Sequence, residues 1–114
     1  MTARIRKVAV LGAGVMGQGI AAHLANAGIP SVLFDMVPRD LGPDATEAER
    51  TRLASQGIQA ALKQKPAAFF HKNLADLVVP ANYEDHGHLL GECDLVIEVV
   101  VELLAVKQKV FAWV

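Results

Sequence analysis

The sequence predicts an α/β protein of the Rossmann type, with a parallel sheet of about four strands in the order 3-2-1-4 and helices on its faces. Short apolar runs alternate along the chain with stretches of helical spacing, which is typical of strand–helix–strand units. Hydrophobic residues make up 53% of the 114 residues, as expected where a parallel sheet is buried on both faces. A glycine-rich turn follows the first apolar run. Right-handed connections between successive parallel strands then give the order 3-2-1-4.

The first part of the chain predicts a strand, a helix and a second strand. We expect strands over residues 5–11 and 31–35, joined by a helix over residues 15–27. Gly28 follows this helix, and glycine is a common residue just past a helix C-terminus. The small alanine side chains of the helix would allow it to pack closely on the sheet.

A long helix is expected next. Asp44 can cap its N-terminus, with Glu47 three residues later in a capping-box arrangement. The helix would extend to about Lys63 and turn an apolar face inward, although Gly57 is expected to weaken it slightly.

The last part of the chain predicts two further strands. The third covers residues 77–79 and stops at Pro80, and a short helical piece follows over residues 89–92. Residues 94–102 begin as a fourth strand, and helical spacing follows from Glu102 onward. That pattern is still in progress at Val114, so we expect the chain to be part of a longer polypeptide.

The turn after the first strand has the spacing G-x-G-x-x-G, with Gly12, Gly14 and Gly17 at the fixed positions. Between a strand and a helix, this spacing is the fingerprint of a dinucleotide site. Gly12 would permit the sharp turn, Gly14 would let a pyrophosphate approach the backbone, and Gly17 would let the helix pack on the strand. Val15 and Met16 begin the helix, whose free N–H groups and positive dipole end would hold the phosphates.

Asp35 ends the second strand, 18 residues after Gly17. In such folds an acid about 20 residues beyond the glycine turn binds the ribose hydroxyls of NAD. Its carboxylate would also repel the additional phosphate of NADP, so Asp35 favours NAD, although Arg39 lies nearby in the sequence. The alternative interpretation is an ordinary aspartate that ends a strand and begins a turn.

Composition argues against several other classes of protein. The 11 basic and 12 acidic residues nearly cancel, so no basic stripe indicates nucleic-acid binding. The single cysteine, Cys93, excludes an internal disulfide and fits a reducing compartment. No apolar run approaches the roughly 20 residues of a membrane span, and glycines interrupt the one stretch that resembles a secretion signal. From the absence of a membrane span and of a secretion signal we predict a cytoplasmic protein. His86 and His88 have no third ligand at motif spacing, so we predict no metal site.

Four segments carry a family resemblance: residues 12–21 with the glycine turn, Phe34-Asp35, residues 80–85 (Pro-Ala-Asn-Tyr-Glu-Asp) and residues 94–102. Together they resemble the NAD-binding domain of the L-3-hydroxyacyl-CoA dehydrogenases. The Lys-Gln-Lys-Pro-Ala stretch at residues 63–67 looks most like the long bacterial fatty-acid oxidation enzymes, which carry an enoyl-CoA hydratase region further along. The resemblance covers nearly the whole chain.

The resemblance implies NAD as cofactor and an acyl-CoA as substrate of the full-length protein. It implies that Met16 contacts NAD and that Asp35 holds the adenosine ribose. The resemblance also implies that the cofactor is lined by Val100, Val101 and Glu102. It implies that Lys107 lies beside the cofactor and near the coenzyme A of the substrate. The catalytic His–Glu pair of the family falls beyond residue 114. We therefore expect residues 1–114 to be a partial NAD-binding domain of a dehydrogenase of fatty-acid β-oxidation, inactive by itself.

Alternatives stay open at this stage. Another NAD-dependent hydroxyacid dehydrogenase or gulonate dehydrogenase has a similar Gly-Met-Gly turn. A non-catalytic dinucleotide-binding module and an FAD-binding protein share the same glycine spacing. We also expect the apolar faces of the last strand and helix to favour self-association into a homo-oligomer.

Overall fold

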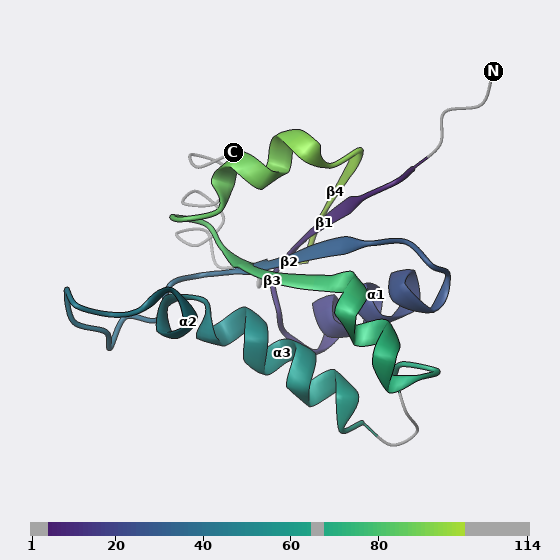
Figure 1. Cartoon of the computed structure of the whole chain (residues 1–114), viewed down its shortest axis with the longest axis horizontal. Coiled ribbons are helices and arrows are strands. Elements are labelled where there is room, and N and C mark those ends of the chain that lie inside the picture. Colours follow the sequence, from purple (N-terminus) through teal and green to yellow (C-terminus); the bar gives the residue numbers. More distant parts are fainter. Residues whose placement is uncertain (1–4, 65–67, 100–114) are drawn as a thin grey trace.

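The computed structural model describes residues 5–64 and 68–99, and it confirms the predicted Rossmann-type sheet. Four parallel strands lie in the order β3-β2-β1-β4 (Figure 1). Their bounds are β1 Val8–Leu11, β2 Ser31–Asp35, β3 Val78–Asn82 and β4 Leu95–Glu98. The central strands β1 and β2 are almost wholly buried, as their continuous apolar sequences predicted.

Helices cover the two faces of this sheet unequally (Figure 1). Their bounds are α1 Val15–Asn26, α2 Glu47–Arg50, α3 Arg52–Leu62, and the 3₁₀ helices η1 Lys72–Leu77 and η2 Gly87–Glu92. One core cluster joins α1, α3 and η1 to alternate residues of the strands, including Val8, Val10 and Leu33. The other cluster, with Ala9, Leu11 and Phe34, packs against the segment that includes η2. Within the described residues, no helix is long and apolar enough to cross a membrane.

Helix α1 ends close to the predicted position. Ala27 is its C-cap, and Gly28 has φ +80°. This left-handed conformation favours glycine and stops the helix before β2 begins.

The predicted start of the second helix is wrong. Asp44 lies in a turn, and Thr46 is the N-cap, with Glu49 rather than Glu47 completing a capping box. The helix is also broken at Thr51, whose hydroxyl donates to the Glu47 carbonyl oxygen at 2.8 Å. Hydroxyl bonds to the preceding turn often bend helices, and here the chain divides into α2 and α3.

Pro80 does not end the third strand as predicted. Strand β3 continues through it to Asn82, with Pro80 opposite Leu33 of β2. Within the described residues β3 lies at one edge of the sheet, where the missing N–H of proline removes no bond to a further strand. The short helical piece is η2, which begins two residues earlier than predicted. Strand β4 covers Leu95–Glu98 of the predicted fourth strand, and residues 100–102 of that prediction lie outside the described residues.

A buried hydroxyl gives a first prediction. Ser31 is fully buried, and its hydroxyl has no hydrogen-bond partner among the described residues. Because an unpaired buried hydroxyl costs about 1–3 kcal/mol, Ser31→Ala is expected to raise the free energy of unfolding by about 1 kcal/mol. Urea unfolding, monitored by circular dichroism, measures this change in the free energy of unfolding.

Thr51→Val is the matched control for this prediction. The Thr51 hydroxyl is also buried, but it donates to the Glu47 carbonyl oxygen and accepts from Asn82 Nδ2 at 3.2 Å. Removing it takes one hydrogen bond from each partner, although the Glu47 carbonyl oxygen keeps the Thr51 N–H and Asn82 Nδ2 keeps Asp85 Oδ2. The free energy of unfolding is therefore expected to fall. Equal effects of the same sign from the two changes would contradict this account of Ser31.

Candidate dinucleotide site

The glycine turn forms a tight passage from β1 to α1. Gly12 has φ +113°, and its N–H donates to the Phe34 carbonyl oxygen at 2.8 Å. The helix then crosses the end of β1 so closely that a Cβ on Gly17 would overlap the Gly12 carbonyl oxygen. These two glycines therefore do what the sequence predicted: one makes the turn, and the other permits the close packing.

The N-terminus of α1 is open. Gly14 is its N-cap, no side chain caps the helix, and its first turn contains no acidic residue. A Cβ on Gly14 would meet no atom within 4 Å, while Val15 and Met16 are 79% and 69% exposed. The first N–H groups of a helix lack partners within the helix and carry the positive end of its dipole. The turn thus has the free space and the donors that a pyrophosphate requires.

Asp35 lies beside this turn. Its Oδ2 accepts from the Ala13 N–H at 2.8 Å, and its Oδ1 accepts from the Met36 N–H at 2.7 Å. Each carboxylate oxygen can accept more than one hydrogen bond, so both can still receive bonds from ribose hydroxyls. The structure therefore brings Asp35 together with the five predicted residues of the turn, and its role toward ribose stays a prediction.

Two residues at the turn were not identified from the sequence as part of the site. Gln18 Nε2 donates to the Ala13 carbonyl oxygen at 2.9 Å. Gly57 of α3 packs on Ala13, so it is a contact residue and not simply a weak point of the helix. An isolated glycine within a helical pattern can indicate such close packing, but nothing in the sequence shows what it contacts. The predicted cofactor residues Val100, Val101, Glu102 and Lys107 lie outside the described residues.

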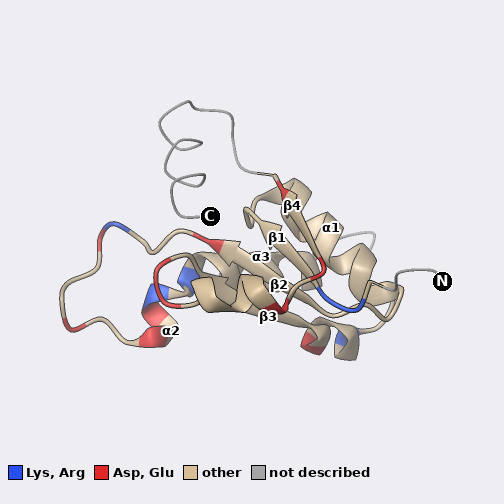
Figure 2. Cartoon of the chain, turned by 90° about the horizontal axis from the view of Figure 1, so that it is seen from above, with Lys and Arg blue, Asp and Glu red and all other residues tan. Residues whose placement is uncertain are grey.

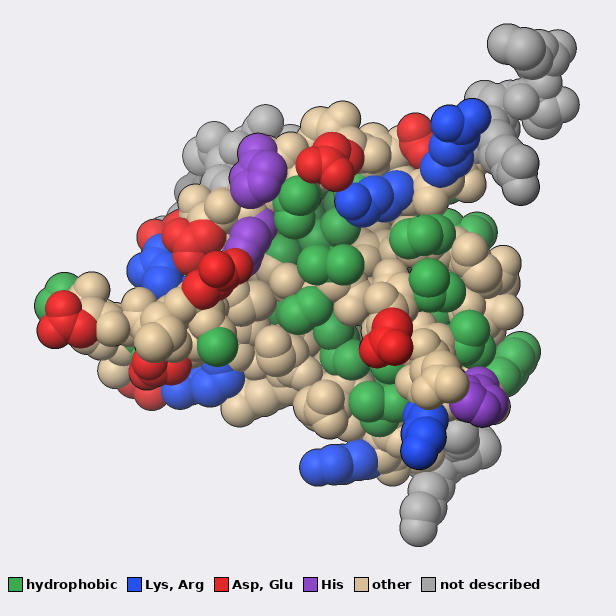
Figure 3. All heavy atoms as spheres, viewed as in Figure 1, with side chains coloured by type: hydrophobic (Ala, Val, Ile, Leu, Met, Phe, Trp, Pro, Cys, Tyr) green, Lys and Arg blue, Asp and Glu red, His purple; other side chains and the backbone are tan. Residues whose placement is uncertain are grey.

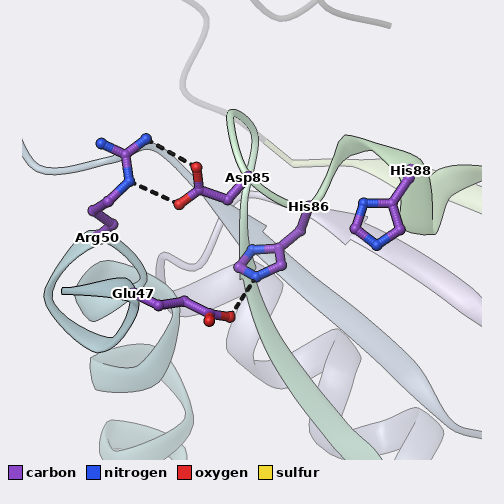
Figure 4. Close-up of a pocket in the computed structure, with 5 residues that line it drawn as sticks. All are labelled: Glu47, Arg50, Asp85, His86 and His88. Atoms are coloured by element: carbon purple, nitrogen blue, oxygen red, sulfur yellow. Dashed lines mark hydrogen bonds and ion pairs between the residues drawn. The ribbon is translucent and has the colours of Figure 1, made fainter.

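A second cluster of polar side chains lies at the carboxyl end of β3 and joins it to α2 (Figure 4). Arg50 donates to Asp85 through two nitrogens, at 2.7 and 3.0 Å. The Asn82 N–H donates to His86 Nδ1 at 3.0 Å, and His86 Nε2 lies 2.9 Å from Glu47 Oε1. A backbone N–H can only donate, so Nδ1 is the acceptor and Nε2 carries the proton toward Glu47.

The hydrogen bonds of this cluster link α2 to the turn that follows β3. Figure 2 shows that basic and acidic residues lie together around α2. In the part of the chain that the structure describes, no three or more His, Cys, Asp or Glu side chains are grouped to hold a metal ion.

The pH dependence of stability gives a second prediction. The Arg50 guanidinium, followed by the Asn82 amide, lowers the pKa of Asp85 to about 2. A carboxylate whose pKa is lowered by folding stabilises the protein above its unfolded pKa, and this contribution is lost as the pH falls from about 4 to about 2. We expect the wild type to be more stable than Asp85→Asn at neutral pH, with the difference shrinking over that range. Urea unfolding at several pH values measures the difference in stability between the two proteins. A difference that stays constant with pH would contradict the lowered pKa of Asp85.

Comparison with known proteins identifies the domain. The family described as "3-hydroxyacyl-CoA dehydrogenase, NAD binding domain" matches residues 7–114. The chain belongs to this family. The sequence-based resemblance is thereby confirmed, and NAD is the cofactor of the domain.

Similar proteins are named as dehydrogenases of 3-hydroxyacyl-CoA or 3-hydroxybutyryl-CoA, or as fatty acid oxidation enzymes. A Bacillus subtilis protein described as a probable 3-hydroxyacyl-CoA dehydrogenase is 50% identical over 123 residues, which cover 100% of this chain and 16% of that protein. A fatty acid oxidation complex subunit alpha from Psychrobacter is 36% identical over 106 residues, covering 93% of this chain and 14% of that protein. The crystal structure of 3-hydroxybutyryl-CoA dehydrogenase from Escherichia coli has a TM-score of 0.61 at 29% identity, covering 96% of this chain and 22% of that one. The chain thus spans less than a quarter of the length of each of these three proteins.

Proposed function

We propose that this chain holds NAD for an enzyme that oxidises L-3-hydroxyacyl-CoA to 3-ketoacyl-CoA in fatty-acid oxidation. The observation that carries the proposal is the open N-terminus of α1 beside Asp35, in a chain of this family. The names of the relatives support the acyl-CoA substrate.

The described residues have binding roles in this proposal. Gly14 leaves room for the pyrophosphate, and the N–H groups of Val15 and Met16 bind its oxygens. Asp35 accepts hydrogen bonds from the adenosine ribose. NAD, when bound, supplies the hydride acceptor. We place Val100, Val101, Glu102 and Lys107 along the cofactor on the family resemblance alone, and we assign proton transfer to residues beyond 114.

A chimera tests this function. The chain replaces the matching segment of the Bacillus subtilis relative, and the intact relative is assayed first as the reference. We expect the chimera to form NADH from L-3-hydroxyacyl-CoA, and the 114-residue chain alone to bind NADH without turnover. A folded chimera that binds NADH but oxidises no L-3-hydroxyacyl-CoA, beside an active reference, would overturn the proposed substrate.

We also propose a cytoplasmic location and a homo-oligomer, with no nucleic-acid partner. Cys93 is a free thiol, and free thiols persist in reducing compartments. Leu95 and Val96 of β4 are 41% and 44% exposed. Hydrophobic side chains also reach the surface across the middle of the face seen in Figure 3. Sedimentation at micromolar concentrations tests association, and a monomer throughout that range would contradict it.

A further inference from the structure

Side chains hold Ala13 of the glycine turn at both of its backbone polar groups. Its N–H donates to Asp35 Oδ2 at 2.8 Å, and its carbonyl oxygen accepts from Gln18 Nε2 at 2.9 Å. Ala13 is only 6% exposed. One residue of the turn is therefore anchored from the end of β2 and from the first turn of α1.

The bond from Gln18 also orients the next N–H group. The Ala13 carbonyl and the Gly14 N–H belong to one planar peptide unit, and in a trans peptide they point in opposite directions. When Gln18 holds the carbonyl, the Gly14 N–H is directed away from Gln18. Gly14 is the N-cap of α1, where a Cβ would meet open space. Gly14 is also exposed, so a ligand phosphate can approach this residue from solvent.

Helix α3 supports the same peptide from a distant part of the sequence. A Cβ on Gly57 would lie 2.9 Å from the Ala13 carbonyl oxygen and 3.0 Å from Ala13 Cβ. Gly57 is buried in the face of α3 that also carries Ala54, Ile58 and Ala61. Any larger residue at position 57 would push α3 or the turn out of place.

We propose that Gln18 and Gly57 are positioning residues of the dinucleotide site, which fix the Ala13–Gly14 peptide so that its N–H faces the incoming pyrophosphate. This inference rests on the proposed binding of NAD at the α1 N-terminus. Gln18 acts through a hydrogen bond and Gly57 through close packing. Neither residue needs to touch the cofactor.

Gln18→Met tests the hydrogen bond, since methionine has a similar length and no N–H donor. NADH and ADP-ribose contain the pyrophosphate, whereas adenosine carries only the ribose and the base. We expect the dissociation constants of NADH and ADP-ribose to rise by about tenfold, which corresponds to the loss of one well-placed interaction with a charged group. The affinity for adenosine, measured by competition with NADH, should change less than about twofold, as expected for a ligand without the phosphates.

Gly57→Ala and Gly19→Ala form a matched pair that tests the packing. Both replace a helical glycine with a better helix former. A Cβ on Gly19 would meet no atom within 4 Å, whereas a Cβ on Gly57 would press on Ala13. We expect Gly57→Ala to weaken NADH binding about tenfold and Gly19→Ala to leave it unchanged.

The outcomes separate this inference from the proposed function. A wild-type chain that is folded by circular dichroism and binds no NADH defeats the proposed function. If the wild type binds NADH and Gln18→Met binds it equally well, the positioning role is overturned. A parallel loss of adenosine affinity in Gln18→Met also overturns it, because the change would then act on the whole fold. Gln18 is only partly buried, so its substitution tests the inference even if Gly57→Ala fails to fold.

Discussion

Gly17→Ala is expected to be among the most damaging single substitutions in the chain. A Cβ at this position would overlap the Gly12 carbonyl oxygen and lie 3.1 Å from the Val99 side chain. Gly12 is fixed by its N–H bond to the Phe34 carbonyl oxygen, so the obstructing atom cannot move without disturbing the β1–β2 pairing. Overpacking costs about 1–3 kcal/mol and occasionally more, and contact with backbone places this substitution at about 3 kcal/mol. Urea unfolding measures the loss, and NADH titration should show no binding.

Gly14→Ala separates the packing function of the turn from its binding function. A Cβ on Gly14 meets nothing within 4 Å, so the free energy of unfolding should stay close to that of the wild type. The same methyl group would occupy the space that a pyrophosphate needs, so NADH binding should be lost. If Gly17→Ala were as stable as Gly14→Ala, the close approach of α1 to β1 would not be essential.

Local sequence signals predicted the sheet and α1 correctly. Strands β1 and β2 are short apolar runs, and the glycines around α1 each have a local backbone requirement: a turn at Gly12 and a left-handed residue at Gly28. The strand order then followed from the handedness of the connections, which depends little on detailed packing.

The errors arose where neighbouring signals compete or where the decisive partner is distant. Asp44 and Thr46 both offer a cap with Glu three residues later, and the sequence gives no reason to prefer the reciprocal bonds that Thr46 makes with Glu49. Pro80 is tolerated because β3 is an edge strand, and that position is known only once the sheet is assembled.

The missed residues of the site have the same explanation. The roles of Gln18 and Gly57 depend on where the Ala13 peptide lies in space. Gly57 is far from Ala13 in the sequence, and Gln18 is a residue type that usually lies on the surface. Glycine spacing therefore indicates that a dinucleotide turn exists, but not which side chains hold it rigid.

The second large effect is expected at Asp35. Asp35→Ala removes the acceptor for ribose hydroxyls and leaves the Ala13 N–H without the bond that it makes at 2.8 Å. We expect NADH binding to weaken by at least about tenfold, since hydrogen bonds to charged groups contribute about 1.5–3 kcal/mol. NADPH should lose less, because its ribose phosphate no longer faces a carboxylate. Calorimetric titration with both nucleotides measures the change in preference.

Asp35→Asn distinguishes the charge of the carboxylate from its geometry. The asparagine side-chain oxygen can keep the bond to the Ala13 N–H, so the turn should stay in place, whereas its amide nitrogen cannot accept the bond that the Met36 N–H makes with the carboxylate. The negative charge is gone, and with it the repulsion toward a ribose phosphate. NADPH affinity should therefore rise in Asp35→Asn relative to wild type, while NADH affinity falls less than in Asp35→Ala. If the ratio of NADH to NADPH affinity is the same in all three proteins, Asp35 does not select the cofactor and serves only to anchor Ala13.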